Sequence, residues 1–158
     1  MSWRLARSAF NQGKGDANRS AMRALVEKGD EPGILLYKDG LAVGWCSVAP
    51  RAEFVALQRS RVWAPVDDRP VWSISCFFVA KAQRNQGLSV ELLRAAVTFA
   101  HSRGARIVEG YPQEVEGGQL PGAFVWTGLA SAYRKAGFQE VLRRSAKKPI
   151  MRYEILPG

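Results

Sequence analysis

The sequence predicts a mixed α/β domain in which antiparallel hairpins surround a βαβα core, and three observations support this fold class. An Asp39-Gly40 pair separates two apolar segments, which is the strongest short signal for a hairpin. A strand-like segment at residues 71–80 runs through a polar loop into the clearest amphipathic helix of the chain. Two further strand-like segments end the chain around a basic turn.

A length of 158 residues with 47% apolar side chains predicts one domain over residues 1–158. No apolar run approaches the ~20 residues that a membrane span needs, and the first residues contain no signal-peptide block. We therefore expect a cytoplasmic protein with no membrane partner.

The first half of the chain contains a helix and then a hairpin. Residues 3–16 mix aromatic, polar and glycine residues, and we expect a poorly defined arm or loop there. Helical spacing of Ala21 and Leu25 predicts a helix over 17–28. The segments after it predict two strands and a short helix, at 33–38, 41–49 and 51–59.

The second half alternates strands and helices. Segment 71–80 is too short and too β-branched for a helix, whereas Leu88, Leu92 and Phe99 recur at helical spacing up to Gly104. Proline and glycine between 112 and 122 mark a long surface loop. The remaining elements are a strand at 105–111, a short helix within 125–138 that ends at Gly137, and strands at 138–144 and 149–155.

Lysine and arginine outnumber aspartate and glutamate by 23 to 14, and the net charge of +9 favours anionic ligands. A solvated basic surface explains the same charge, and no nucleic-acid-binding motif accompanies the basic segment 143–148, so nucleic acid is an unfavoured partner. Cys46 and Cys76 have no metal-ligand spacing, so we expect reduced thiols and no metal.

The turn at residues 84–89 joins the strand at 71–80 to the N-terminus of the best helix. Free backbone N–H groups, the helix dipole and Gly87 make such a turn suitable for a phosphate group. The chain contains neither GxGxxG after this strand nor GxxxxGK[ST], which disfavours dinucleotides and nucleoside triphosphates. A plain structural connection has the same pattern, so the turn alone leaves both interpretations open.

The turn Arg-Asn-Gln-Gly-Leu-Ser resembles the pyrophosphate signature [RQ]-x-x-G-x-[GA] of GNAT acetyltransferases, with Ser89 at the last small position. The residues FFV precede this turn. About fifty residues after it, the segment AYRKAGF resembles the family's last helix and the strand that enters its terminal hairpin. The resemblance runs from Gly33 to Ile155 in the family's element order. A GNAT-like subgroup resembles this chain in the segments GWCSVAPR, VEGYP and VWTGLA, and its members have more sequence before the first helix. We therefore expect a shortened N-terminal arm at residues 1–16. Whether the family's first strand is present stays open.

This resemblance implies a GNAT-like fold, with a mixed, mostly antiparallel sheet, a parallel splayed pair and flanking helices. It implies acetyl-CoA as cosubstrate and transfer of its acetyl group to a primary amine in a ternary complex. Backbone groups of Phe78 and Val79 would hold the pantetheine, and the N–H near Val79 would polarise the thioester carbonyl. The pyrophosphate would contact the turn residues Arg84, Asn85, Gln86, Gly87, Leu88 and Ser89.

Two side chains are candidates for proton transfer. Tyr133 matches the tyrosine that protonates the departing thiolate in many family members, although packing against the sheet explains it equally well. Glu109 is the only acid in its strand and our candidate general base, with an arginine ion pair as the alternative. His101 lies near a helix C-terminus, where a dipole contact accounts for it.

Aromatic residues could line an acceptor pocket, with Tyr111 and Trp126 first because they flank the long loop; the others are Trp45, Trp63 and Trp72. Such a pocket would suit a compact amine with an apolar body. The acceptor stays open between a small-molecule and a peptide amine, and a homodimer stays open. The alternative function is a non-catalytic acyl-CoA-binding regulatory module.

Overall fold

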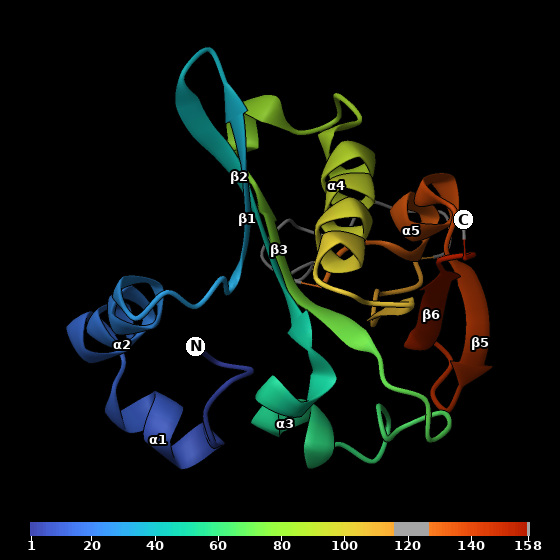
Figure 1. Ribbon diagram of the computed structural model, residues 1–158, viewed down its shortest axis with the longest axis horizontal. Coiled ribbons are helices and arrows are strands. Elements are labelled where there is room, and N and C mark those ends of the chain that lie inside the picture. Colours follow the sequence, from blue (N-terminus) through green and yellow to red (C-terminus); the bar gives the residue numbers. More distant parts are fainter. Residues whose placement is uncertain (116–126, 158) are drawn as a thin grey trace.

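The computed structural model describes residues 1–115 and 127–157, and within them six strands form one sheet in the order β1-β2-β3-β4-β6-β5 (Figure 1). The strands are β1 (Gly33–Lys38), β2 (Leu41–Pro50), β3 (Trp72–Val79), β4 (Ile107–Gly110), β5 (Gln139–Arg143) and β6 (Pro149–Glu154). The helices are α1 (Arg7–Gln12), α2 (Asp16–Glu27), α3 (Val55–Gln58), α4 (Leu88–Ser102) and α5 (Ala130–Ala136).

The predicted mixed fold class is confirmed. Strand β3 runs parallel to β4, and the other neighbouring strands are antiparallel. The turn between β1 and β2 is the predicted Asp39-Gly40 hairpin, and both residues have positive φ, 50° and 76°. This left-handed pair matches the twist of the strands that it joins.

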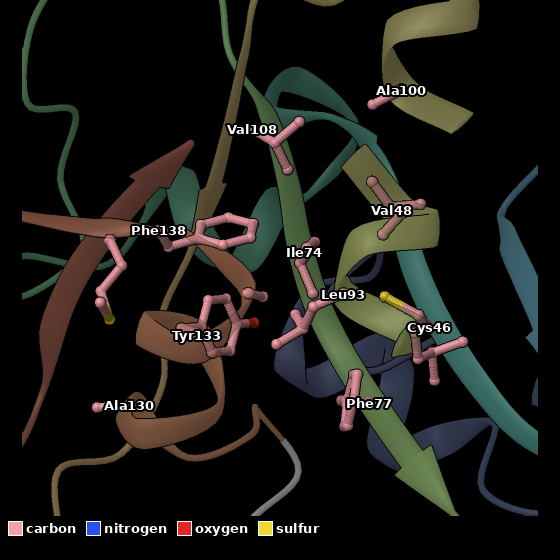
Figure 2. Packing of buried hydrophobic residues seen from close by; sticks show 14 of the residues in the cluster. Cys46, Val48, Ile74, Phe77, Leu93, Ala100, Val108, Ala130, Tyr133 and Phe138 are labelled. Carbon is pink, nitrogen blue, oxygen red and sulfur yellow. The ribbon is translucent and has the colours of Figure 1, made fainter. Parts of the chain in front are cut away.

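Two apolar cores lie on opposite faces of the sheet. Helices α4 and α5 lie together on one side of the sheet, while α1, α2 and α3 lie on the other (Figure 1). The larger core packs Leu93 of α4 and Tyr133 of α5 against Ile74 of β3. Figure 2 shows this cluster, in which the Tyr133 and Phe138 rings meet edge to face with centroids 5.0 Å apart.

The second core ties the N-terminal segment to α3. It contains Phe54, Leu57 and Tyr111, with Trp3 and Trp63 packed against them. The backbone N–H of Ala56 donates to the carbonyl of Trp3 at 3.1 Å. Trp3 is therefore held in this core by its ring and bound to α3 by its backbone.

The prediction of a loop over residues 3–16 is wrong for Arg7–Gln12, which form α1. Helix α1 has only six residues, which is shorter than the window over which an apolar helical period can be recognised. The helix predicted at 125–138 begins at Ala130, after Leu129 in extended conformation. In the described residues, no helix combines the length and apolar character that a membrane crossing requires.

Strands β3 and β4 separate after a short parallel contact. Their pairing ends at Ile74 and Gly110, whereas β3 continues to Val79. The register between β2 and β3 shifts at the same level: Ser47 pairs with Cys76 and Val48 with Ile74, so one residue of β3 is extra. Such a bulge bends and twists its strand, which accounts for the divergence of β3 from β4.

Candidate functional site

The diverging part of β3 presents a backbone edge that β4 does not cover. The N–H of Ala80 donates to the carbonyl of Val43 at 2.8 Å, so the backbone groups at Ala80 face β2. Backbone directions alternate along a strand, and the N–H of Val79 therefore points away from β2, toward the uncovered edge. Phe78 is half exposed and Val79 is buried. This edge matches the expected thioester site in position.

The turn from β3 into α4 has the backbone shape expected of an anion site. Asn85 and Gly87 have positive φ, 61° and 76°, and Gly87 is the residue that precedes α4. No side chain caps the helix at Gly87, which leaves the first N–H groups of α4 without a side-chain partner. A Cβ atom at Gly87 would meet nothing within 4 Å, so the space beside the turn is open.

Lys38, at the end of β1, reaches the same turn from the hairpin. Its Nζ donates to Oε1 of Gln83 and Oε1 of Gln86, at 3.0 Å in each case. Sequence reasoning missed this lysine because it lies 48 residues before Gln86. Lys38 adds a positive charge beside the helix N-terminus, where an anion is already favoured.

Arg84 closes the other end of the turn. Its Nε donates to the carbonyl of Val79 at 3.0 Å, linking the turn to the last residue of β3. Leu88 and Ser89, the first residues of α4, are half-buried. The structure thus brings the expected cofactor residues Phe78, Val79 and 84–89 together along one edge of the fold.

Tyr133 projects from α5 to the point where β3 and β4 diverge. Its Oη donates to the carbonyl of Thr127 at 3.2 Å, and the residue is fully buried. Burial disfavours the phenolate, which raises the pKa of Tyr133 well above its usual value. The phenol is therefore protonated over the whole neutral range.

Glu109 lies in a buried ion-pair network before the divergence. Oε2 accepts from Nε of Arg152 at 2.7 Å, and Oε1 accepts from Oη of Tyr111 at 2.7 Å and faces Nη1 of Arg51 at 3.4 Å. Arg152 also pairs with Asp67 at 2.6 Å. Two guanidinium groups and a phenol already bind this carboxylate, an arrangement that favours the ion-pair interpretation of Glu109 over the general-base one.

The expected pocket aromatics have different positions. Tyr111 is buried, with its hydroxyl between Glu109 and Arg51, and burial raises its pKa above the ordinary value. Its ring lies behind Trp63, with centroids 5.9 Å apart. Trp126 lies outside the described residues.

A cavity of about 440 Å³ opens near the divergence of the strands. Its lining includes Trp3, Ala56, Trp63, Cys76, Gln113 and Thr127, and we call it the indole cavity. Cys76 belongs to the part of β3 that β4 does not cover, and both cysteines are free thiols. Burial raises the pKa of the Cys76 thiol, so this group is a weak nucleophile at neutral pH.

Comparison with known proteins identifies a family. The model of the acetyltransferase (GNAT) family matches residues 2–114. No curated protein sequence matches the chain. Among solved structures, the ribosomal-protein-alanine N-acetyltransferase from Brucella melitensis is 17% identical, with a TM-score of 0.53 over 87% of this chain and 76% of that chain.

Two other solved structures are similar. The N-acetyltransferase from Staphylococcus aureus Mu50 is 12% identical, with a TM-score of 0.52 over 88% of this chain and 76% of that one. The aminoglycoside acetyltransferase AAC(6')-Ib, solved with coenzyme A, is 21% identical, with a TM-score of 0.51 over 76% of this chain and 64% of that one. At these identities the likeness shows a shared fold.

Proposed function

Since the chain belongs to the acetyltransferase (GNAT) family, we propose that it transfers an acetyl group from acetyl-CoA to a primary amine by direct attack in a ternary complex. The observation that carries this proposal is the divergence of β3 from β4 after Ile74, next to the turn that begins α4. An extended pantetheine can pair with a free strand edge, and a diphosphate can bind a helix N-terminus.

The residues of the turn and the strand edge fit acetyl-CoA. Open space beside Gly87 and the positive charge of Lys38 suit a diphosphate, and the uncovered edge at Val79 suits an amide-containing arm. The backbone of Phe78 faces β2 by the same alternation, so its expected role in holding the pantetheine is not supported. The cosubstrate would supply the acetyl thioester. The N–H of Val79 is a fixed donor for the thioester carbonyl, and such a donor needs no particular side chain.

Tyr133 is the group that we propose to protonate the departing thiolate. It lies where the strands diverge, and its phenol stays protonated because burial raises its pKa. Direct transfer agrees with the state of Cys76, whose raised thiol pKa disfavours a covalent acetyl-enzyme. We place Glu109 in the supporting network, since Arg152 and Arg51 already hold its carboxylate.

The test has two readouts, which are calorimetric titration with CoA and release of CoA from acetyl-CoA in the presence of amines. We expect saturable binding and amine-dependent release. Gly87→Ala should weaken CoA binding about tenfold, which corresponds to about 1.4 kcal/mol, because a methyl group would face the diphosphate. No CoA affinity at low salt would contradict the proposal.

Gly29→Ala is the matched control for Gly87→Ala. Gly29, which follows the end of α2, also has positive φ, 94°, and a Cβ atom there would also meet nothing within 4 Å. Both substitutions add the same left-handed strain, of about 1 kcal/mol, to the folded state. Only Gly87 lies at the start of α4, so equal losses of CoA affinity in the two variants would contradict the turn assignment.

A non-catalytic acyl-CoA-binding module is the second candidate. One observation favours it: the lining of the indole cavity contains no carboxylate or imidazole among the described residues that could take the proton of the amine. CoA binding without release of CoA over a broad panel of amines between pH 7 and 9.5 would support this alternative. Release that depends on the amine would exclude it.

A further inference from the structure

The indole cavity reaches the proposed reaction centre. Cys76 places one wall on the uncovered part of β3, and Thr127 places another beside Tyr133, whose hydroxyl donates to the Thr127 carbonyl. The remaining walls come from the N-terminal segment, α3 and the loop after α3. An amine bound in this cavity would therefore lie next to both the strand edge and the proposed general acid.

Two indole rings dominate the lining. Trp3 and Trp63 have centroids 5.2 Å apart at an interplanar angle of 45°, so they form a bent apolar wall. Ala56 and Cys76 add apolar surface, and Gln113 and Thr127 are neutral polar residues. A volume of about 440 Å³ lies in the range of pockets that enclose small ligands.

The charge of the cavity disfavours a polycation. Its lining contains no aspartate or glutamate within the described parts of the chain. Nζ of Lys148 lies 5.4 Å from the Trp63 ring centroid, which places a positive charge at this wall. A ligand with several ammonium groups would lose hydration without gaining carboxylate partners.

We propose that the acetyl acceptor is a primary monoamine on an aromatic or other apolar body. This inference rests on the proposed function and specifies its substrate class. The apolar body would pack against the wall that Trp3 and Trp63 form, and the uncharged amine would point toward β3. The proposal disfavours two other classes of acceptor, which are polycationic aminoglycosides and the lysine side chains of basic peptides.

The test compares amines at fixed acetyl-CoA by release of CoA. The monoamines are 2-phenylethylamine, tyramine and tryptamine; the opposing probes are kanamycin, spermidine and a lysine-containing basic peptide. We expect kcat/KM for the best monoamine to exceed that for each opposing probe by at least about tenfold. A monoamine gains an aromatic contact and does not have to bury a second ammonium group, and together these two effects suffice for such a ratio. A higher kcat/KM for any opposing probe would overturn the inference.

Two variants of the cavity make the test specific. Trp63→Leu should raise the KM for tryptamine about tenfold and leave the KM for acetyl-CoA unchanged. Ala56→Glu places a carboxylate in the lining and should shift the preference toward spermidine by at least about tenfold. Trp72→Leu is the matched control, because Trp72 packs against Phe99 of α4, at 6.1 Å between centroids.

The result for the acceptor can be separated from that for the cofactor. Calorimetric titration of tryptamine into protein saturated with CoA measures acceptor binding without turnover, and thermal unfolding reports whether each variant is folded. CoA binding with a preference for polycations would overturn the acceptor class and leave the proposed function standing. Loss of tryptamine binding in Trp63→Leu but not in Trp72→Leu supports the class even if turnover is slow.

Discussion

The ring of Tyr133 lies against the backbone of Gly110, so closely that a Cβ atom added at Gly110 would be 2.1 Å from Cε1 of the ring. Gly110 is the last residue of β4 and pairs with Ile74 at the end of the parallel contact. On the other side, a Cβ atom at Gly128 would lie 3.0 Å from Cε2. Two glycines thus position the phenol where the strands diverge.

Gly110→Ala should lower the free energy of unfolding by about 2 kcal/mol, because the new methyl group and the Tyr133 ring would occupy the same space. Chemical denaturation measures this loss. In a Tyr133→Ala background, the additional cost of Gly110→Ala should fall below about 1 kcal/mol. An equal cost in both backgrounds would show that the ring is not what excludes a side chain at position 110.

Tyr133→Phe should lower kcat about 100-fold and leave the affinity for CoA unchanged, since only the proton donor is removed. Burial raises the pKa of Tyr133, so the neutral, proton-donating form persists above the ordinary titration range of a tyrosine. The kcat of the wild type should accordingly show no fall caused by this group up to pH 9.5. Steady-state kinetics over pH 6.5–9.5 checks both statements, and an unchanged kcat in the variant would remove Tyr133 from the mechanism.

Lys38→Gln should raise the Kd for CoA about fivefold, which corresponds to about 1 kcal/mol for an exposed charge beside a phosphate. The amide of the new glutamine keeps polarity but removes the charge that faces Gln83 and Gln86. Calorimetry at two salt concentrations measures the change, which should shrink as salt increases. Lys28→Gln, at the end of α2, is the control and should leave the Kd unaltered.

Glu109→Gln should lower the free energy of unfolding by about 3 kcal/mol, because in a buried site Arg51 would lose its carboxylate partner and Arg152 would keep only Asp67. The shape of the kcat pH profile should stay the same if Glu109 supports the fold and takes no proton. Loss of the acidic limb of that profile would restore the general-base role. Glu154→Gln, which breaks the exposed pair with Arg69, should cost less than about 1 kcal/mol.

Elements with strong local signals could be predicted from the sequence, and their residues explain why. The Asp39-Gly40 turn, the apolar segment of β3 and the helical spacing of α4 depend on backbone preferences and on neighbours within a few residues. Helix α1 could not be predicted because its six residues are too few to show a helical period. The beginning of α5 was misplaced because Leu129 continues the apolar pattern outside the helix.

The sequence by itself determined the order of the elements, the position of the turn that begins α4, and the resemblance to the GNAT family. Only the tertiary structure decided which distant side chains share a site. Lys38 contacts Gln86, Glu109 pairs with Arg51 and Arg152, and Trp3 packs on Trp63. Backbone periodicity reflects interactions between near neighbours, whereas these contacts arise when the sheet and its helices close around two cores and bring segments from far apart in the chain together.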